Sequence, residues 1–368
     1  MKTFLITTVS LIFFLFFSAA IFLSTVGLNT NKLNQVILDQ IKKKEPNLDI
    51  NINKIKIKLN IKKTNIYLFT KNPLVKYEDI DLPIEDIKIF VNFLTLLNSK
   101  LEIEKIALNI NELNVNDLKK IIVRAKPSDF KSFILNNIKK GFIKGNFEAT
   151  FSKKLKLIDF KTNGKIKEMA FNGLNNLNLI DVNFNFIADK DLILINSLSA
   201  DLKGVEVTNG YIDIKTKDNL IINGSVKTSI NANNNQVIKL FSNTKNLKIL
   251  NNKIKLRGNF MNRFNLNFSK SLELKEYSFD ISGDVNESLI VLKNKIKNRY
   301  LKNEISKLNF DKTDVKINFN KNKKNSFLVS GNYNFDNKKY EKFKITNTSD
   351  KSGNNFNLNF DLNEEIIL

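Results

Sequence analysis

The sequence predicts a mainly β fold, in which an N-terminal transmembrane helix precedes a long, curved antiparallel sheet with a few short helices. Three observations predict this fold. Residues 4–28 contain no charged residue. From Asp49 onward, apolar residues recur mostly at every second position, which is the period of a strand with one buried face. Seven glycines stand inside these alternating stretches, each followed two positions later by an apolar residue.

Composition excludes several classes of function. The chain has 368 residues, a length sufficient for one large domain or two ordinary ones. Hydrophobic residues make up 42% of it, which permits a packed structure. It contains neither Cys nor His, so disulfides, thiolate chemistry, the commonest general base and the commonest transition-metal ligand are all missing. No local group of Asp, Glu or Lys is spaced for acid–base chemistry. We therefore expect no enzyme, no cofactor and no metal site, unless the fold brings a distant carboxylate pair together.

The formal net charge of +22 has two interpretations. A strongly basic protein can bind nucleic acid or an anionic membrane surface. Alternatively, an A/T-rich codon usage enriches Lys, Asn, Ile and Phe without selection for charge. Only four of the 59 basic residues are Arg, and the Lys residues are scattered along alternating stretches. We therefore expect no nucleic-acid partner, while attraction to anionic lipid head groups stays open.

Residues 1–29 predict a membrane anchor, because roughly 20 apolar residues span a bilayer as a helix. The alternative is a cleaved signal peptide, with Lys2 as its charged start and "SAA" at 18–20 as its cleavage site. The apolar run continues beyond that site, which favours a retained anchor. Lys residues flank the segment on both sides, so the positive-inside rule does not orient it. The predicted anchor residues are Phe4, Leu5, Leu11, Phe13, Phe14, Phe16, Phe17, Ile21, Phe22, Leu23 and Leu28.

Three short helices are predicted from apolar residues at helical spacing. The first covers residues 30–45 and stops before Pro46. The second covers residues 117–125. The third begins after Ser128 and ends at Gly141, a residue type that commonly terminates helices. A fourth helix over residues 288–308 could interrupt the sheet.

The remaining chain predicts strands separated by Asn, Asp, Lys and Gly, as in hairpins. In "DININKIKIKLNI", from Asp49, the apolar parity slips by one place after Ile52, which predicts a bulge or bend between two strands. Further strands are predicted within residues 66–68, 84–91, 100–110, 113–115, 176–188, 205–215, 219–230, 264–268, 315–320 and 356–362.

The recurring glycines share the parity of the apolar residues around them, so they belong to the apolar face of the sheet. A missing side chain on a concave face lets a sheet curl, and we predict that these glycines bend it. The alternative is ordinary hairpin chemistry, with glycine near turns. The glycines are Gly145, Gly164, Gly210, Gly224, Gly258, Gly283 and Gly331.

Three stretches resemble segments of a known family. "FLTLLNSKLEIEKIALNINELNV" (93–115) resembles a recurring segment of AsmA-like proteins, and "LDININKIKIKL" (48–59) looks like that family's first strands. "SDFKSFILNNIKKGFIKGNF" (128–147) is similar to an element of the YhdP and TamB-like relatives. The resemblance divides the chain into an anchor (1–29), an N-terminal AsmA-like region (30–150) and a C-terminal β-rich region (151–368).

This resemblance implies a function. AsmA-like proteins are similar to chorein-type bridge proteins, with a U-shaped, taco-like sheet and an apolar inner groove. They are anchored in the inner membrane, project into the periplasm of Gram-negative-type cells, and are implicated in moving phospholipid towards the outer membrane. The implied partners are phospholipid or another acyl-chain lipid, the inner membrane and an outer-membrane or envelope protein. The family has no catalytic motif that this chain could match.

The groove candidates are the apolar residues on the inward side of each predicted strand. A sandwich would bury the same residues against a second sheet, so an anchored structural or adhesive protein without lipid cargo stays open. The candidates are Ile50, Ile52, Ile55, Ile57, Leu59, Ile103, Ile106, Leu108, Val182, Phe184, Phe186, Ile212, Ile214, Ile222, Val226, Phe264, Leu266, Phe268, Val315, Ile317, Phe319, Phe356, Leu358 and Phe360.

Overall fold

The structure is a computed structural model of the chain. It describes residues 2–31, 34–52, 54–61, 65–92, 102–124, 127, 129–172, 178–202, 204–217, 219–233, 250–269, 271, 273–336, 338–350 and 353–361. The chain divides into two compact units: unit 1 contains Met1–Ile166 and Ile187–Lys190, and unit 2 contains Lys167–Phe186 and Asp191–Leu368. The predicted anchor residues Phe4 and Leu5 lie in a described helix, but their side chains lie outside the description.

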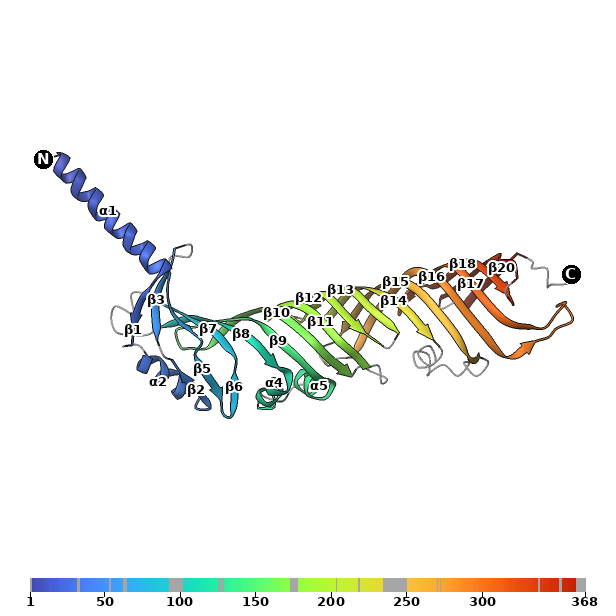
Figure 1. Ribbon diagram of the computed structural model, residues 1–368, viewed down its shortest axis with the longest axis horizontal. Coiled ribbons are helices and arrows are strands. Elements are labelled where there is room, and N and C mark those ends of the chain that lie inside the picture. The colour runs from blue at the N-terminus through green and yellow to red at the C-terminus, as the bar shows by residue number, and fades with distance from the viewer. Residues whose placement is uncertain are drawn as a thin grey trace. The chain divides into compact units, whose positions relative to one another are not determined.

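The described helices belong to unit 1 (Figure 1). They are α1 (Lys2–Thr25), α2 (Asn34–Lys44), α4 (Val115–Ile122) and α5 (Asp129–Asn137). The three predicted short helices are therefore present. The predicted stop of the third at Gly141 is wrong, because α5 ends at Asn137 and strand β9 (Ile138–Phe151) follows directly. From Phe142, β9 pairs with β8 (Ile103–Asn114), and this ladder replaces the helical hydrogen bonds.

Unit 1 contains an antiparallel sheet in the pairing order β1–β3–β4–β7–β8–β9. Strand β3 therefore lies between β1 and β4. A second, three-stranded sheet has the order β2–β5–β6. The remaining strands of these sheets are β1 (Leu28–Thr30), β2 (Leu48–Asn51), β3 (Ile55–Asn60), β4 (Asn65–Lys71), β5 (Leu74–Tyr77), β6 (Ile80–Leu82) and β7 (Ile84–Val91).

The parity slip after Ile52 marks a change of sheet. Strand β2 ends at Asn51 in the small sheet, and β3 begins at Ile55 in the larger one. The two sheets and α2 enclose the core of unit 1, with Ile37 of α2, Ile55 of β3 and Leu68 of β4 almost completely buried. In Figure 1, α2 and the small sheet lie on the same side of β3 and β7. The apolar residues of β2 and those of β3 therefore face one shared core.

Unit 2 is built from strands alone in the part of the chain that the structure describes. Strands β12 to β20 pair antiparallel in sequence order. They are β12 (Leu192–Asp201), β13 (Val205–Lys215), β14 (Leu220–Asn233), β15 (Leu250–Phe268), β16 (Leu274–Ile296), β17 (Ile305–Asn320), β18 (Asn325–Phe335), β19 (Glu341–Asp350) and β20 (Gly353–Phe360). Strands β10 (Leu157–Asn172) and β11 (Asn178–Asp189) each contribute residues to both units. The predicted long antiparallel sheet is thus confirmed as antiparallel pairing over many strands.

The predicted helix over residues 288–308 is wrong. This stretch contains the end of β16 and the start of β17, paired through Ser288 with Phe310 and Ile290 with Leu308. Leu292 and Ile305 are buried there, at 8% and 4% exposure. The apolar residues fit both a helical period and the two-residue period of a strand. The stretch forms strands because the neighbouring strands supply backbone hydrogen-bond partners for that conformation.

All seven glycines lie inside strands, not in the turns between them. Gly145 of β9 and Gly164 of β10 allow two backbones to approach closely. A Cβ atom added to Gly145 would lie 2.3 Å from the Asn163 carbonyl oxygen, and one added to Gly164 would lie 2.2 Å from the Lys144 carbonyl oxygen. These short distances between the two backbones explain why side chains are excluded at Gly145 and Gly164.

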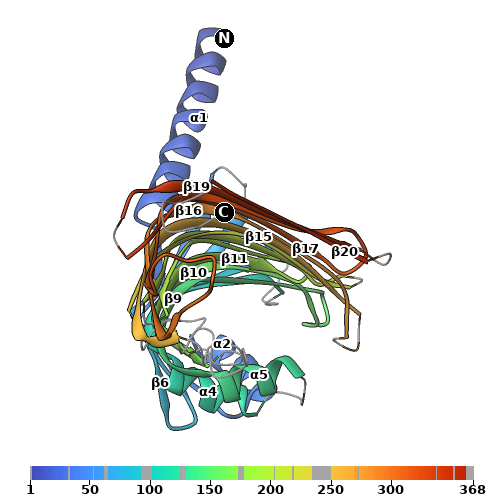
Figure 2. The ribbon, with the colours of Figure 1, turned by 90° about the vertical axis from the view of Figure 1, so that its right-hand side faces the viewer.

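Figure 2 shows that β15, β16 and β17 bow to the same side.

Candidate lipid-binding surfaces

Unit 1 holds an apolar cavity of about 430 Å³ between its two sheets and α2. Small-molecule sites commonly have volumes of roughly 300–1,000 Å³, so the cavity is large enough for part of a hydrocarbon chain. Six predicted groove residues line it, namely Ile50, Ile52, Ile55, Ile103, Ile106 and Leu108. The fold thus brings together residues that are far apart in the sequence.

The lining of this cavity is almost free of polar groups. Glu45, next to the end of α2, and Thr70 of β4 are its polar side chains, and Thr70 is 5% exposed. Sequence reasoning missed the contributions of Ile87 and Ile89, although both lie in the alternating strand β7. The predicted candidates Ile57 and Leu59 do not line the cavity; Ile57 packs against the adjoining core. A nonpolar lining of this kind favours hydrocarbon over a charged ligand.

The sheet of unit 2 has one apolar face, which the strand registers define directly. One row of cross-strand neighbours runs through Ile212, Gly224, Phe264, Phe279 and Phe319. Directly paired residues of an antiparallel sheet point to the same face, so this row is continuous from β13 to β17. We call this surface the apolar face.

Parallel rows extend the apolar face to β20. One such row is Phe260, Gly283, Val315, Val329, Ile345 and Leu358. The unit 2 candidates on β13, β14, β15, β17 and β20 all share this face: Ile212, Ile214, Ile222, Val226, Phe264, Leu266, Phe268, Val315, Ile317, Phe319, Phe356, Leu358 and Phe360. Val182, Phe184 and Phe186 lie on β11, where the two Phe rings meet edge to face with centroids 6.4 Å apart.

The opposite face of unit 2 is polar. On β14 and β15, the residues between the apolar ones include Asn223, Ser225, Lys227, Arg263 and Asn265. Asn223 accepts a hydrogen bond from the side chain of Asn265 and donates one to Asp213. Tyr211 of β13 is an aromatic exception on this face, paired with Ser225 and 45% exposed. The sheet of unit 2 is therefore amphipathic.

Several side chains of the apolar face remain open to solvent. Phe279 is 36% exposed, Phe319 48%, and Phe356 57%. Sequence reasoning missed Tyr277, Phe279 and Ile281, although they alternate within "EYSFDISGDV" at residues 276–285. Tyr277 stacks on Phe319 with ring centroids 5.8 Å apart. An exposed, contiguous apolar surface is typical of a site that binds a partner or ligand.

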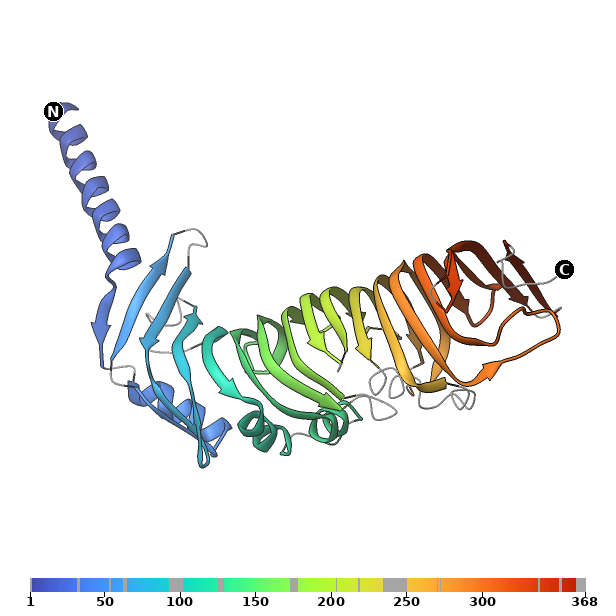
Figure 3. The same cartoon turned by 45° about the vertical axis from the view of Figure 1, so that its right-hand side comes forward.

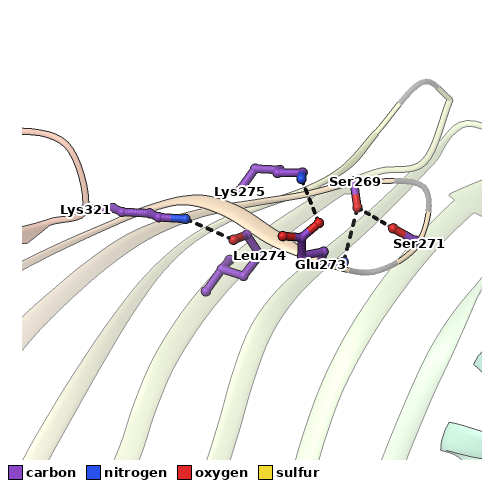
Figure 4. A network of polar contacts seen from close by, with 6 residues as sticks. All are labelled: Ser269, Ser271, Glu273, Leu274, Lys275 and Lys321. Carbon is purple, nitrogen blue, oxygen red and sulfur yellow. Dashed lines mark hydrogen bonds and ion pairs between the residues drawn. The ribbon is translucent and has the colours of Figure 1, made fainter.

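A polar network joins the end of β15 to the start of β16 (Figure 4). Ser269 accepts a hydrogen bond from the Glu273 backbone N–H at 3.2 Å, and Lys275 donates to Glu273 at 2.6 Å. Lys321 donates to the carbonyl oxygen of Leu274 at 3.3 Å. The hydrogen bond from Lys275, with its charge, lowers the pKa of Glu273. The network thus gathers two lysines at this end of the sheet.

The outer face of the unit 1 sheet combines lysines and aromatic rings. Lys58 lies over the Phe69 ring at 5.3 Å, and Lys105 lies over the Phe90 ring at 5.2 Å. Lys105 also pairs with Glu148. Burial, followed by the nearby charge of Asp86, raises the pKa of Tyr67 on this face. These contacts give several charges of this face local partners.

Helix α1 leads directly into β1 (Figure 3). At its end, Lys58 donates a hydrogen bond to the Thr25 carbonyl oxygen at 3.0 Å. Phe13, Phe14 and Phe16 are 72%, 67% and 76% exposed. Other predicted anchor residues also have exposed side chains, namely Leu11, Phe17, Ile21, Phe22 and Leu28. The side chain of Leu23 is half-buried.

A search of the described residues found no helix with both the length and the apolar character needed to cross a membrane.

Within the described residues, no group of three or more His, Cys, Asp or Glu side chains is placed to hold a metal ion.

Comparison with known proteins found no relative: no family model, no curated protein and no solved structure matches the chain.

Proposed function

We propose that this chain binds the acyl chains of phospholipids on the apolar face of unit 2 and in the cavity of unit 1. In this proposal the protein carries lipid between membranes of a Gram-negative-type envelope. The observation that carries the proposal is the amphipathic sheet of unit 2, with Phe279, Phe319 and Phe356 exposed on its apolar face and amides, hydroxyls and charges opposite. The unit 1 cavity, with its aliphatic lining, supports it independently.

The proposed mechanism requires no covalent chemistry. Moving an acyl chain from a bilayer into water costs about 0.8 kcal/mol of free energy for each CH₂ group. An apolar protein surface that covers the chain removes this cost. The head group would remain in water at the margin of the sheet, where Lys275 and Lys321 could contact its phosphate. Glycines such as Gly283 make room for neighbouring rings of the apolar face, since a Cβ atom added there would lie 2.7 Å from Cδ1 of Phe260.

The AsmA-like resemblance of the sequence supports an inner-membrane and periplasmic setting for this proposal. In this proposal α1 anchors the chain in the inner membrane, unit 2 lies in the periplasm, and a second envelope protein receives the lipid. The charge-free run from Phe4 to Leu28 and the exposed Phe side chains of α1 support the anchor.

The anchor makes a prediction for membrane extraction. The full chain, expressed in a bacterial host, is expected to stay in the membrane pellet during alkaline carbonate washing. A Phe13→Lys/Phe16→Lys variant should move largely to the supernatant, because each charge at the centre of an apolar helix opposes insertion by roughly 2.5–3.5 kcal/mol. Release of the unchanged chain would contradict the anchor.

Lipid content tests the proposed function. The full chain, purified in a mild detergent from a bacterial host, should carry phospholipid in native mass spectra and in solvent extracts. An anchored structural or adhesive protein would be folded and free of stoichiometric lipid under the same conditions. That second result would contradict lipid binding and favour the structural alternative.

A further inference from the structure

Strand β20 forms an edge of the unit 2 sheet. It pairs with β19 from Gly353 to Phe360 without a register shift, and all eight of its residues are exposed. Its other edge has no partner strand within the residues that the structure describes. An exposed edge of this length offers a row of backbone donors and acceptors to another strand.

Edge strands usually carry features that prevent such pairing. Charged side chains, proline, bulges and short length are the common ones. The β20 sequence, "GNNFNLNF", contains no charge and no proline, and its ladder contains no bulge. Its neighbour β19 carries Lys342 and Lys344. Among the described residues, strand β20 therefore lacks the usual protection at its open edge.

The ladder fixes which backbone groups point outward. The Asp361 N–H donates to the Lys342 carbonyl oxygen at 2.9 Å. Hydrogen-bonded and non-hydrogen-bonded pairs alternate in an antiparallel ladder, so Asn355, Asn357 and Asn359 bond to β19. The N–H and C=O groups of Phe356, Leu358 and Phe360 consequently point to the open edge.

The open edge is also held in a strand conformation. The Phe360 ring lies 5.2 Å from the Tyr333 ring and 5.8 Å from the Phe343 ring, centroid to centroid. The Tyr333 hydroxyl donates to the Asp361 carbonyl oxygen at 2.7 Å. A strand that is already ordered loses less conformational entropy on association.

We propose that β20 pairs antiparallel with β20 of a second copy of this chain, giving a twofold-symmetric dimer centred on Leu358. In this register Leu358 faces its own counterpart, and Phe356 faces Phe360 of the other copy. Each of these pairs exchanges two hydrogen bonds through the outward backbone groups. Apolar side chains meet apolar ones on one face, and Asn357 meets Asn359 on the other.

The self-complementary strand favours a second copy over a head-to-tail contact. Strand β1 has three residues, which is too short to match the eight of β20. Isologous pairing of identical edges closes as a dimer and leaves no β20 edge free for further growth. The apolar face would continue from one copy into the next, but the pairing itself does not depend on lipid binding.

The absence of Cys from the chain permits a direct test by crosslinking. The full chain with Leu358→Cys would place two thiols opposite each other, with Cα atoms about 5.5 Å apart, within the range for a disulfide. Mild oxidation in detergent is expected to give a covalent dimer in most of the protein. Tyr211→Cys, at a 45% exposed position on the polar face, is the control for random collision and should remain mostly monomeric.

A second variant tests the pairing without a disulfide. Leu358→Lys adds like charges at the centre of the proposed contact, while the 54% exposed side chain contributes little to the fold. Light scattering should give twice the chain mass for the unchanged protein and a single chain mass for Leu358→Lys, with the same unfolding midpoint. Unchanged protein that is monomeric throughout, equal crosslinking of both Cys variants, or a Leu358→Lys dimer would overturn the proposal.

Discussion

Replacing Phe279 and Phe319 together by Asp is expected to lower the phospholipid bound to the purified chain by at least about tenfold. Both rings belong to the same cross-strand row of the apolar face, and both are partly exposed. Full burial of one Phe side chain contributes roughly 1.5–3 kcal/mol, and a carboxylate placed against an acyl chain adds a desolvation cost. Mass spectrometry of solvent extracts, normalised to protein, measures the change.

Tyr211→Asp provides the matched control for this experiment. Tyr211 is as exposed as Phe319, at 45% against 48%, but lies on the polar face beside Ser225. The control should keep its lipid, and both proteins should keep the urea midpoint of the unchanged chain. An equal loss of lipid in both, or no loss in either, would contradict binding at the apolar face.

The second large effect is expected in the core of unit 1. Leu68 of β4 is 2% exposed and belongs to the cluster that contains Ile37 and Ile55. Leu68→Ala should lower the free energy of unfolding by about 2–5 kcal/mol, because it removes buried hydrocarbon and leaves a cavity. Urea unfolding followed by circular dichroism measures the change.

Leu74→Ala is the control for the loss of the same atoms at the surface. Leu74 lies in the same unit and is 65% exposed. Its replacement is expected to change the free energy of unfolding by less than about 0.5 kcal/mol. A similar small effect for Leu68→Ala would show that the core of unit 1 is not packed as described.

The alternation of apolar residues predicted many of the strands, and it predicted which residues of several strands share a face. Strand β7 has the bounds that its sequence predicts, Ile84–Val91, and Val315, Ile317 and Phe319 share one face as expected. A two-residue period is a local property, so the sequence carries it fully. The bounds of long strands were harder to predict, because β16 continues through polar residues that a local pattern does not join to it.

Two features depend on contacts that no local pattern contains. The stretch 288–308 fits a helix in isolation, and its pairing as β16 and β17 is decided by partners on either side. The cavity of unit 1 is lined by Ile50 from one sheet and Ile106 from the other, and their separation in the sequence gives no sign of this. The close approach of Gly145 to Gly164 likewise appears only when β9 and β10 are side by side.

The most direct test of lipid binding uses the absence of Trp from the chain. A Phe319→Trp variant carries a single fluorophore on the apolar face, and a Tyr211→Trp variant carries one on the polar face. Phospholipid with brominated acyl chains quenches Trp on contact. We expect strong quenching of the Phe319→Trp variant and little of the Tyr211→Trp variant. Equal quenching of the two, or none of the first, would contradict the claim that the apolar face holds acyl chains.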